Sequence, residues 1–349
     1  MKNKNNNSNL RETYKAIFKI SEEDYQKAKK HPEEENYYDI YLEIFDSLIN
    51  NFDKDKLKEA IEDTNPWKTS NSSNNKFKSL AASDYKILES LLKLNIDDLN
   101  QNGKTEAKSI IESRFDDFEH AFDGNFINPK VILLGINPKM ASNHKPYGLE
   151  NTVYKEPFNE KCPVLNHPED DFNKDYYFKK SGFFYTREVP ENIRKKHIKL
   201  STDPDSNRDS NTPFALLEVF PYASENVKEW QKGYKIFHSL RPYFNLKKTL
   251  PSQIWLVCLL TYAIKNTTNL FLYLRIDNVN FRKNFLDPYF DLLSLKSSGT
   301  IKVLTKKSSI PKFSKNNIKP YFKELTLNIR TDSAESFFED IWCISLNHN

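Results

Sequence analysis

The run from Lys130 to Gly135 constrains the fold of this 349-residue chain more than any other segment. Four consecutive apolar residues, Val-Ile-Leu-Leu, stand between the lysine and the glycine, and no polar residue alternates with them. Strands that are apolar on both faces are typical of parallel sheets, which are covered on both sides. Gly135 closes the run and Ile136-Asn137-Pro138 follows, so the pattern predicts a buried strand that ends at a turn.

Three later runs, at 214–220, 269–276 and 300–305, predict further strands, and helical segments separate them. The predicted helices lie at about 226–240, 251–265 and 281–290, with a last helix near Lys319. Strands that alternate with helices predict parallel pairing through right-handed crossovers, with ligands at the carboxyl ends of the strands. The expected fold class is therefore α/β, with a four-stranded parallel sheet in a three-layer αβα arrangement.

Residues 1–120 lack this alternation of strands and helices. Apolar residues at helical spacing predict helices within 10–63 and 83–122, the last of them capped by Gly124. We expect a helical N-terminal extension over 1–120 and an α/β domain over 121–349, with a long polar insertion at about 154–212. A connection of that length at the ligand-binding edge is either a functional lid or filler without structure.

Charge separates the two parts. Residues 1–120 carry 19 Lys and Arg against 24 Asp and Glu, whereas residues 121–349 carry 33 against 24. A basic α/β part favours an anionic partner such as nucleic acid, although a solvated Lys-rich surface gives the same counts. The acidic helical part is a candidate surface for a protein partner.

Composition excludes several classes of function. Only seven glycines are present and no Gly-rich phosphate loop occurs. The three cysteines, Cys162, Cys258 and Cys343, are too scattered for a disulfide framework or a metal site, so we expect no metal and no cofactor. The N-terminus has no apolar run, and the longest apolar stretch, 254–264, is too short for a bilayer, so we expect a cytoplasmic protein without a membrane partner.

The candidate site begins where the first strand ends. Gly135 allows close backbone approach, Pro138 fixes the turn, and Asn137 offers both a donor and an acceptor. Tyr147 follows between Pro146 and Gly148, and its ring can stack on a planar ligand. The same residues also fit simpler roles, with Asn137 as a cap of the following turn and Tyr147 as an ordinary aromatic.

These motifs resemble the uracil-DNA glycosylase superfamily, in which a strand, Gly-x-Asn-Pro and Pro-Phe-Gly follow one another. The resemblance covers the strand and helix order of about residues 120–330. It implies that Asn137 orients the attacking water and that Tyr147 stacks on a flipped base. The chain departs from the family at the base-reading position, where Glu218 replaces Asn, and in the last motif, where Lys307 replaces His.

The departures point to a particular chemistry. Cleavage of an N-glycosidic bond leaves negative charge on the departing base, which Lys307 can offset, unless it is one more solvated lysine. An ionised Glu218 is only an acceptor, so it suits the exocyclic amine of cytosine and faces the oxygens of uracil unfavourably. A buried glutamate near a strand end is costly without a partner, which favours a functional role. We therefore expect a cytosine-type base.

The segment after the last strand is a candidate DNA contact. Ser309, Ile310, Lys312 and Phe313 combine wedge-like apolar side chains with a phosphate-binding cation, and a surface turn is the alternative reading. The predicted function is a DNA glycosylase-like hydrolase, serving repair or attack on modified foreign DNA. The alternatives are a non-catalytic module of the same fold that binds nucleic acid or protein, and a hydrolase or transferase of free nucleosides.

Overall fold

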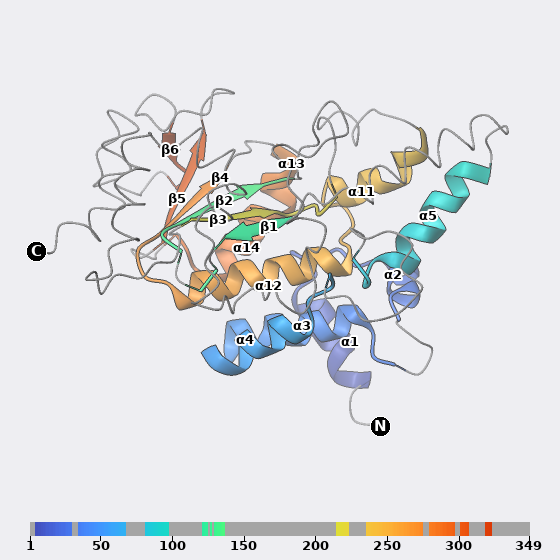
Figure 1. Ribbon diagram of the computed structural model, residues 1–349, viewed down its shortest axis with the longest axis horizontal. Coiled ribbons are helices and arrows are strands. Elements are labelled where there is room, and N and C mark those ends of the chain that lie inside the picture. The colour runs from blue at the N-terminus through green and yellow to red at the C-terminus, as the bar shows by residue number, and fades with distance from the viewer. Residues whose placement is uncertain are drawn as a thin grey trace, which may run out of the picture.

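Four parallel strands form the centre of the structure (Figure 1). They are β2 (Val131–Gly135), β3 (Phe214–Glu218), β4 (Leu270–Leu274) and β5 (Ile301–Lys306). The predicted four-stranded parallel sheet is thereby confirmed. The computed structural model describes residues 4–29, 34–67, 81–97, 121–124, 126–127, 129–136, 214–222, 235–274, 279–296, 301–306 and 318–322.

Two short strands extend this sheet at its edges. β1 (Phe122–Gly124) pairs antiparallel with β3, and β6 (Ile318–Pro320) pairs antiparallel with β5, which gives the order β1-β3-β2-β4-β5-β6. The predicted helix end at Gly124 was wrong, and Lys319, near which a last helix was predicted, lies in a strand. Both segments pair instead with backbone groups that an edge strand leaves open, and Pro320 is tolerated because it lies on an outer strand. The predicted helical residues 104–120 lie outside the described residues.

The two faces of the sheet differ in what they contact. Successive strand residues point to opposite faces, and the register pairs Ile132 with Ala215 and with Leu272. The face of Ile132 belongs to the hydrophobic cluster that includes the helices. The opposite face carries Gly135 and Glu218, which are paired in the register of β2 and β3.

Helix α12 (Pro251–Asn266) is buried on every side over most of its length. Every residue from Pro251 to Ile264 is buried, as expected of a helix that is apolar all round. The helix begins at Pro251 in the favoured first position, and the Gln253 side chain accepts a hydrogen bond from the Leu250 N–H at 2.9 Å. None of the described helices is both long and apolar enough to cross a bilayer.

Helices α3 (Tyr37–Asn50) and α4 (Lys54–Asp63) cover the side of α12 that faces away from the sheet (Figure 1). The other N-terminal helices are α2 (Glu22–Lys27), α1 (Lys4–Thr13), which packs on α3, and α5 (Tyr85–Asp97), which packs on α2 and on η3 (Lys235–Leu240). The Trp255 indole N–H donates to the Ile61 carbonyl at 3.1 Å, and the Tyr38 hydroxyl donates to the Thr249 carbonyl at 2.8 Å. These helices and the sheet therefore share one hydrophobic cluster.

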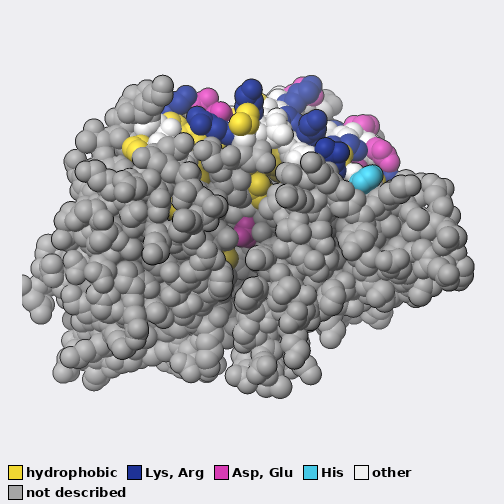
Figure 2. All heavy atoms as spheres, turned by 90° about the horizontal axis from the view of Figure 1, so that it is seen from above, with side chains coloured by type: hydrophobic (Ala, Val, Ile, Leu, Met, Phe, Trp, Pro, Cys, Tyr) yellow, Lys and Arg dark blue, Asp and Glu magenta, His cyan; other side chains and the backbone are white. Residues whose placement is uncertain are grey.

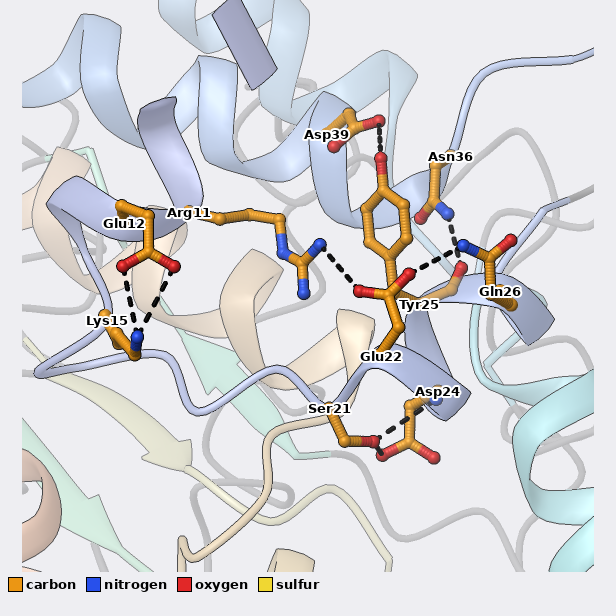
Figure 3. A network of polar contacts seen from close by, with 10 residues as sticks. All are labelled: Arg11, Glu12, Lys15, Ser21, Glu22, Asp24, Tyr25, Gln26, Asn36 and Asp39. Carbon is orange, nitrogen blue, oxygen red and sulfur yellow. Dashed lines mark hydrogen bonds and ion pairs between the residues drawn. The ribbon is translucent and has the colours of Figure 1, made fainter. Parts of the chain in front are cut away.

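A polar network joins α1, α2 and α3 (Figure 3). The Arg11 guanidinium lies over the Tyr25 ring, 4.3 Å from its centroid, and contacts the Glu22 carboxylate at 3.3 Å. The Tyr25 hydroxyl donates to Asp39 at 2.6 Å, and the Asn36 amide donates to the Tyr25 carbonyl at 2.6 Å. Burial raises the pKa of Tyr25, so the phenol remains a donor throughout the physiological range. The network fixes the packing of the first three helices.

The remaining helices follow β3 and β4. The 3₁₀ helix η3 (Lys235–Leu240) and α11 (Arg241–Phe244) precede α12. After β4 come α13 (Val279–Phe281), the π-helical turn η4 (Arg282–Leu286) and α14 (Asp287–Leu292), in the region predicted to be helical. The hydroxyls of Thr261 in α12 and Tyr289 in α14 are 2.9 Å apart. Helices α12 and α14 therefore pack together.

Removal of residues 1–67 will expose the side of α12 that α3 and α4 cover. We expect this shortened chain to lose cooperative unfolding, because a large apolar helix face then meets water. Thermal denaturation followed by circular dichroism, together with binding of a hydrophobic dye, measures the effect. A chain that lacks only residues 1–3 is the control. A sharp transition at the wild-type temperature in the 1–67 deletion would contradict this account.

Candidate functional site

A buried carboxylate lies directly over a glycine at the carboxyl edge of the sheet. Glu218 is the last residue of β3, Gly135 is the last residue of β2, and the two are register partners. Only 3% of Glu218 is exposed to solvent. The structure thus brings together two residues that the sequence analysis selected for separate reasons.

Gly135 is required here for space. A Cβ atom at this position would lie 1.8 Å from Glu218 Oε2 and 2.3 Å from its carboxyl carbon. Both distances are far below any contact that real Cβ atoms make. The carboxylate therefore rests on the bare backbone of β2, and the expected close approach to Gly135 is made, within the described chain, by Glu218.

The backbone around Glu218 is held from both sides. Its N–H donates to the Ala121 carbonyl at 2.6 Å, just before β1. Beyond the strand ends, Val219 N–H donates to the Gly135 carbonyl at 3.1 Å and Phe220 N–H donates to the Ile136 carbonyl at 2.6 Å. The segments that leave β2 and β3 therefore remain hydrogen-bonded past the strand ends, which fixes the backbone of Glu218 relative to Ile136.

The topology makes this edge a favoured place for a ligand. From β2 the chain passes to β3 on one side, and it returns to β4 on the other side of β2. In open α/β sheets, ligands bind outside the carboxyl ends of the strands where the strand order reverses in this way. Figure 2 shows an acidic side chain, in magenta, next to hydrophobic side chains near the centre of the view.

A second buried carboxylate, Asp84, lies just before α5. Its oxygens accept hydrogen bonds from the Ser252 N–H at 2.9 Å and from the Tyr222 hydroxyl at 2.7 Å, and also from the hydroxyls of Ser252 and Ser83. Leu250, the residue at the N-cap of α12, has no side-chain acceptor, so Asp84 caps this helix from a distant segment. Because Tyr222 follows Glu218 by four residues, Asp84 also anchors the chain that leaves β3.

Sequence analysis did not identify Asp84 as important. The signal was weak, because a Ser-Asp pair before a helix is most simply read as a local cap. In the structure, burial raises the pKa of Asp84 to about 6, while the hydrogen bonds from Ser252 and Tyr222 oppose that rise. A carboxyl group with such a pKa changes its protonation state close to neutral pH.

The other predicted site residues lie outside the described residues. These are the catalytic candidates Asn137 and Lys307, the binding candidates Pro138 and Tyr147, and the DNA-contact candidates Ser309, Ile310, Lys312 and Phe313. Within the described part of the chain, His, Cys, Asp and Glu side chains do not gather in threes as a metal site requires. The chemistry that the described residues support is recognition of a hydrogen-bond donor, or of positive charge, by a carboxylate at the sheet edge.

Comparisons with models of protein families, with curated proteins and with solved structures find no match for this chain.

Replacement of Gly135 by Ala will displace the Glu218 carboxylate. We expect Gly135→Ala to lower the free energy of unfolding by about 1–3 kcal/mol, the usual cost of overpacking. In the Glu218→Ala background the added methyl group has space, so the same replacement should cost much less. Chemical denaturation of the wild type, both single variants and the double variant measures this coupling. Additive effects of the two replacements would show that the two side chains do not compete for one position.

The raised pKa of Asp84 predicts a pH-dependent stability. Below about pH 4 the group is protonated in both the folded and unfolded states. As pH rises towards 6 the unfolded chain releases its proton first, so the free energy of unfolding falls. A rise from 3.8 to about 6 corresponds to a loss of about 3 kcal/mol. We expect Asp84→Asn to remove this fall. Denaturation curves of both proteins at pH 4 to 8 test the prediction, and parallel pH dependences would refute it.

Proposed function

We propose that the protein is a DNA glycosylase-like hydrolase that cleaves the N-glycosidic bond of a flipped, cytosine-type base. The proposal includes the three-layer, uracil-DNA glycosylase-like form of the α/β fold. The observation that carries it is the Glu218 carboxylate, buried over Gly135 at the carboxyl edge of the sheet. The sequence motifs beginning at Gly135 support the same reading.

The carboxylate accounts for the choice of base. In its ionised form it accepts hydrogen bonds and donates none. Cytosine offers an exocyclic amine, whereas uracil offers an oxygen at the same position and would meet the carboxylate with repulsion. Since Glu218 is buried and its backbone is fixed by Ala121 and by β2, the acceptor is preorganised for a donor on a planar guest.

The bond-breaking residues are proposed from the sequence. Asn137, two residues after Gly135, orients a water molecule towards C1′ of the flipped nucleotide. Lys307, directly after β5, offsets the negative charge that builds on the departing base. Tyr147 stacks on that base, and the segment from Ser309 to Phe313 contacts the DNA. The net change is addition of water across the glycosidic bond, which leaves an abasic site and the free base.

Base excision from synthetic oligonucleotides tests this function. Duplexes and single strands that contain 5-methylcytosine, 5-hydroxymethylcytosine, cytosine or uracil are incubated with the protein, and abasic sites are revealed by alkaline cleavage. We expect excision of a cytosine-type base. In Glu218→Gln, which fills the same space over Gly135, the preference for that base over uracil should fall about 10- to 100-fold, because a bidentate base contact contributes about 1–3 kcal/mol of discrimination.

Two further variants sharpen the experiment. Asn137→Ala should reduce excision about 10²- to 10⁴-fold while the fold is retained, as expected for loss of a group that positions the attacking water. Lys296→Ala, an exposed change at the end of the α14 region, is the matched control and should leave excision unchanged. Excision of uracil alone that persists in Glu218→Ala would refute the base assignment. Release of base from free nucleosides only would instead support a nucleoside hydrolase.

A further inference from the structure

Two segments beside the sheet carry cations and no acidic residue. The first, 235–248, comprises η3, α11 and the turn after them, and contains Lys235, Arg241, Lys247 and Lys248. The second, 279–286, comprises α13 and η4, and contains Arg282 and Lys283. By contrast, the N-terminal 120 residues have an excess of acidic side chains. The positive charge is thus concentrated on particular elements.

The two segments lie next to each other. The side-chain amide of Asn284 in η4 donates to the Asn245 carbonyl in the turn after α11 at 3.0 Å. The Lys19 ammonium group, from the N-terminal region, donates to the Asn284 carbonyl at 3.2 Å. The two cation-bearing segments are therefore in contact, and Lys19 of the N-terminal region is bonded to the second of them.

Some of these cations are already engaged, and others are not. Lys248 contacts the buried Asp24 carboxylate at 3.4 Å, and Arg282 contacts Asp287 at 3.8 Å. Arg241, Lys247 and Lys283 are exposed and have no acidic partner among the described residues. We call these three residues the cationic rim. Their charge is available to a ligand.

The cationic rim borders the edge at which Glu218 lies. Helix α11 belongs to the connection that leaves the carboxyl end of β3, and η4 belongs to the connection that leaves the carboxyl end of β4. In Figure 1, α11 lies beyond the end towards which β3 points. Figure 2 shows Lys and Arg side chains along one edge of the surface, with Asp and Glu side chains among them.

We propose that the cationic rim binds the phosphate backbone of a nucleic-acid strand that passes the Glu218 site, so that the substrate is a polymer and not a free nucleoside. This inference rests on the proposed function. Cations at the rim of a site hold the backbone in register while base contacts are made elsewhere. An anionic membrane is disfavoured, because Val279 is the only exposed large hydrophobic residue where side-chain exposure is described, at 238–248 and 279–286, and interfacial helices need an apolar face.

Binding of a fluorescent oligonucleotide at several salt concentrations tests the proposal. The rim variant carries Arg241→Glu, Lys247→Glu and Lys283→Glu. The control carries Lys15→Glu, Lys54→Glu and Lys265→Glu, which are exposed positions outside the two segments with the same change in net charge. The slope of log Kobs against log salt is negative, and each lost phosphate contact reduces its magnitude by about 0.7–0.9. We expect the rim variant to reduce that magnitude by about 2–3, and the control to reduce it by less than 1.

Three results would contradict the proposal that the cationic rim binds nucleic acid. These are an equal loss of affinity in the control, an unchanged slope in the rim variant, and binding to phosphatidylserine vesicles without binding to the oligonucleotide. A neutral variant, Arg241→Gln with Lys247→Gln and Lys283→Gln, should show a reduced slope as well, and thermal melts confirm that each variant folds. Salt-dependent binding that needs the rim, without any base excision, would support this surface and refute the proposed chemistry, so the two failures are distinguishable.

Discussion

The structure depends on one constraint, the burial of helix α12 on every side. Its residues from Pro251 to Ile264 leave no polar stripe for water, so the helix needs a partner on each face. The sheet supplies one and the N-terminal helices α3 and α4 supply the other. Those helices are therefore an integral part of the described α/β core, which explains why side chains as distant in sequence as Ile61 and Trp255 are joined.

The first turn of α12 is connected to the candidate site through hydrogen bonds. Asp84 accepts from the N-terminal turn of α12 and from Tyr222, four residues after Glu218. The segment that leaves β3 is also hydrogen-bonded to Gly135 and Ile136 at the end of β2. The Glu218 carboxylate is thereby held at the edge of a rigid framework, as a group that recognises a ligand by position needs to be. The framework stabilises a costly buried carboxylate at the point where its fold class binds ligands.

Elements with a clear local pattern could be predicted from the sequence. Contacts between residues that are far apart in the sequence could not. The apolar runs at 131–134 and 270–274 indicated buried strands because each is unbroken. The three-residue strands β1 and β6 are too short to show a period, and they form only because the sheet edges are there to pair with. Asp84 and Ser252 are 168 positions apart, so no local pattern could connect them. Gly135 indicated a close approach, and the register then showed what approaches it.

The central claim is that Glu218 reads a base that lies at the carboxyl edge of the sheet, beside Gly135. A crystal structure of the Asn137→Ala variant with an oligonucleotide that contains 5-methylcytosine tests it most directly. If Glu218 recognises the base, the base is flipped out of the DNA and its exocyclic amine lies within hydrogen-bond distance, about 3 Å, of the Glu218 carboxylate. A base bound elsewhere, or protein side chains filling the space beside Gly135 and Glu218, would contradict it.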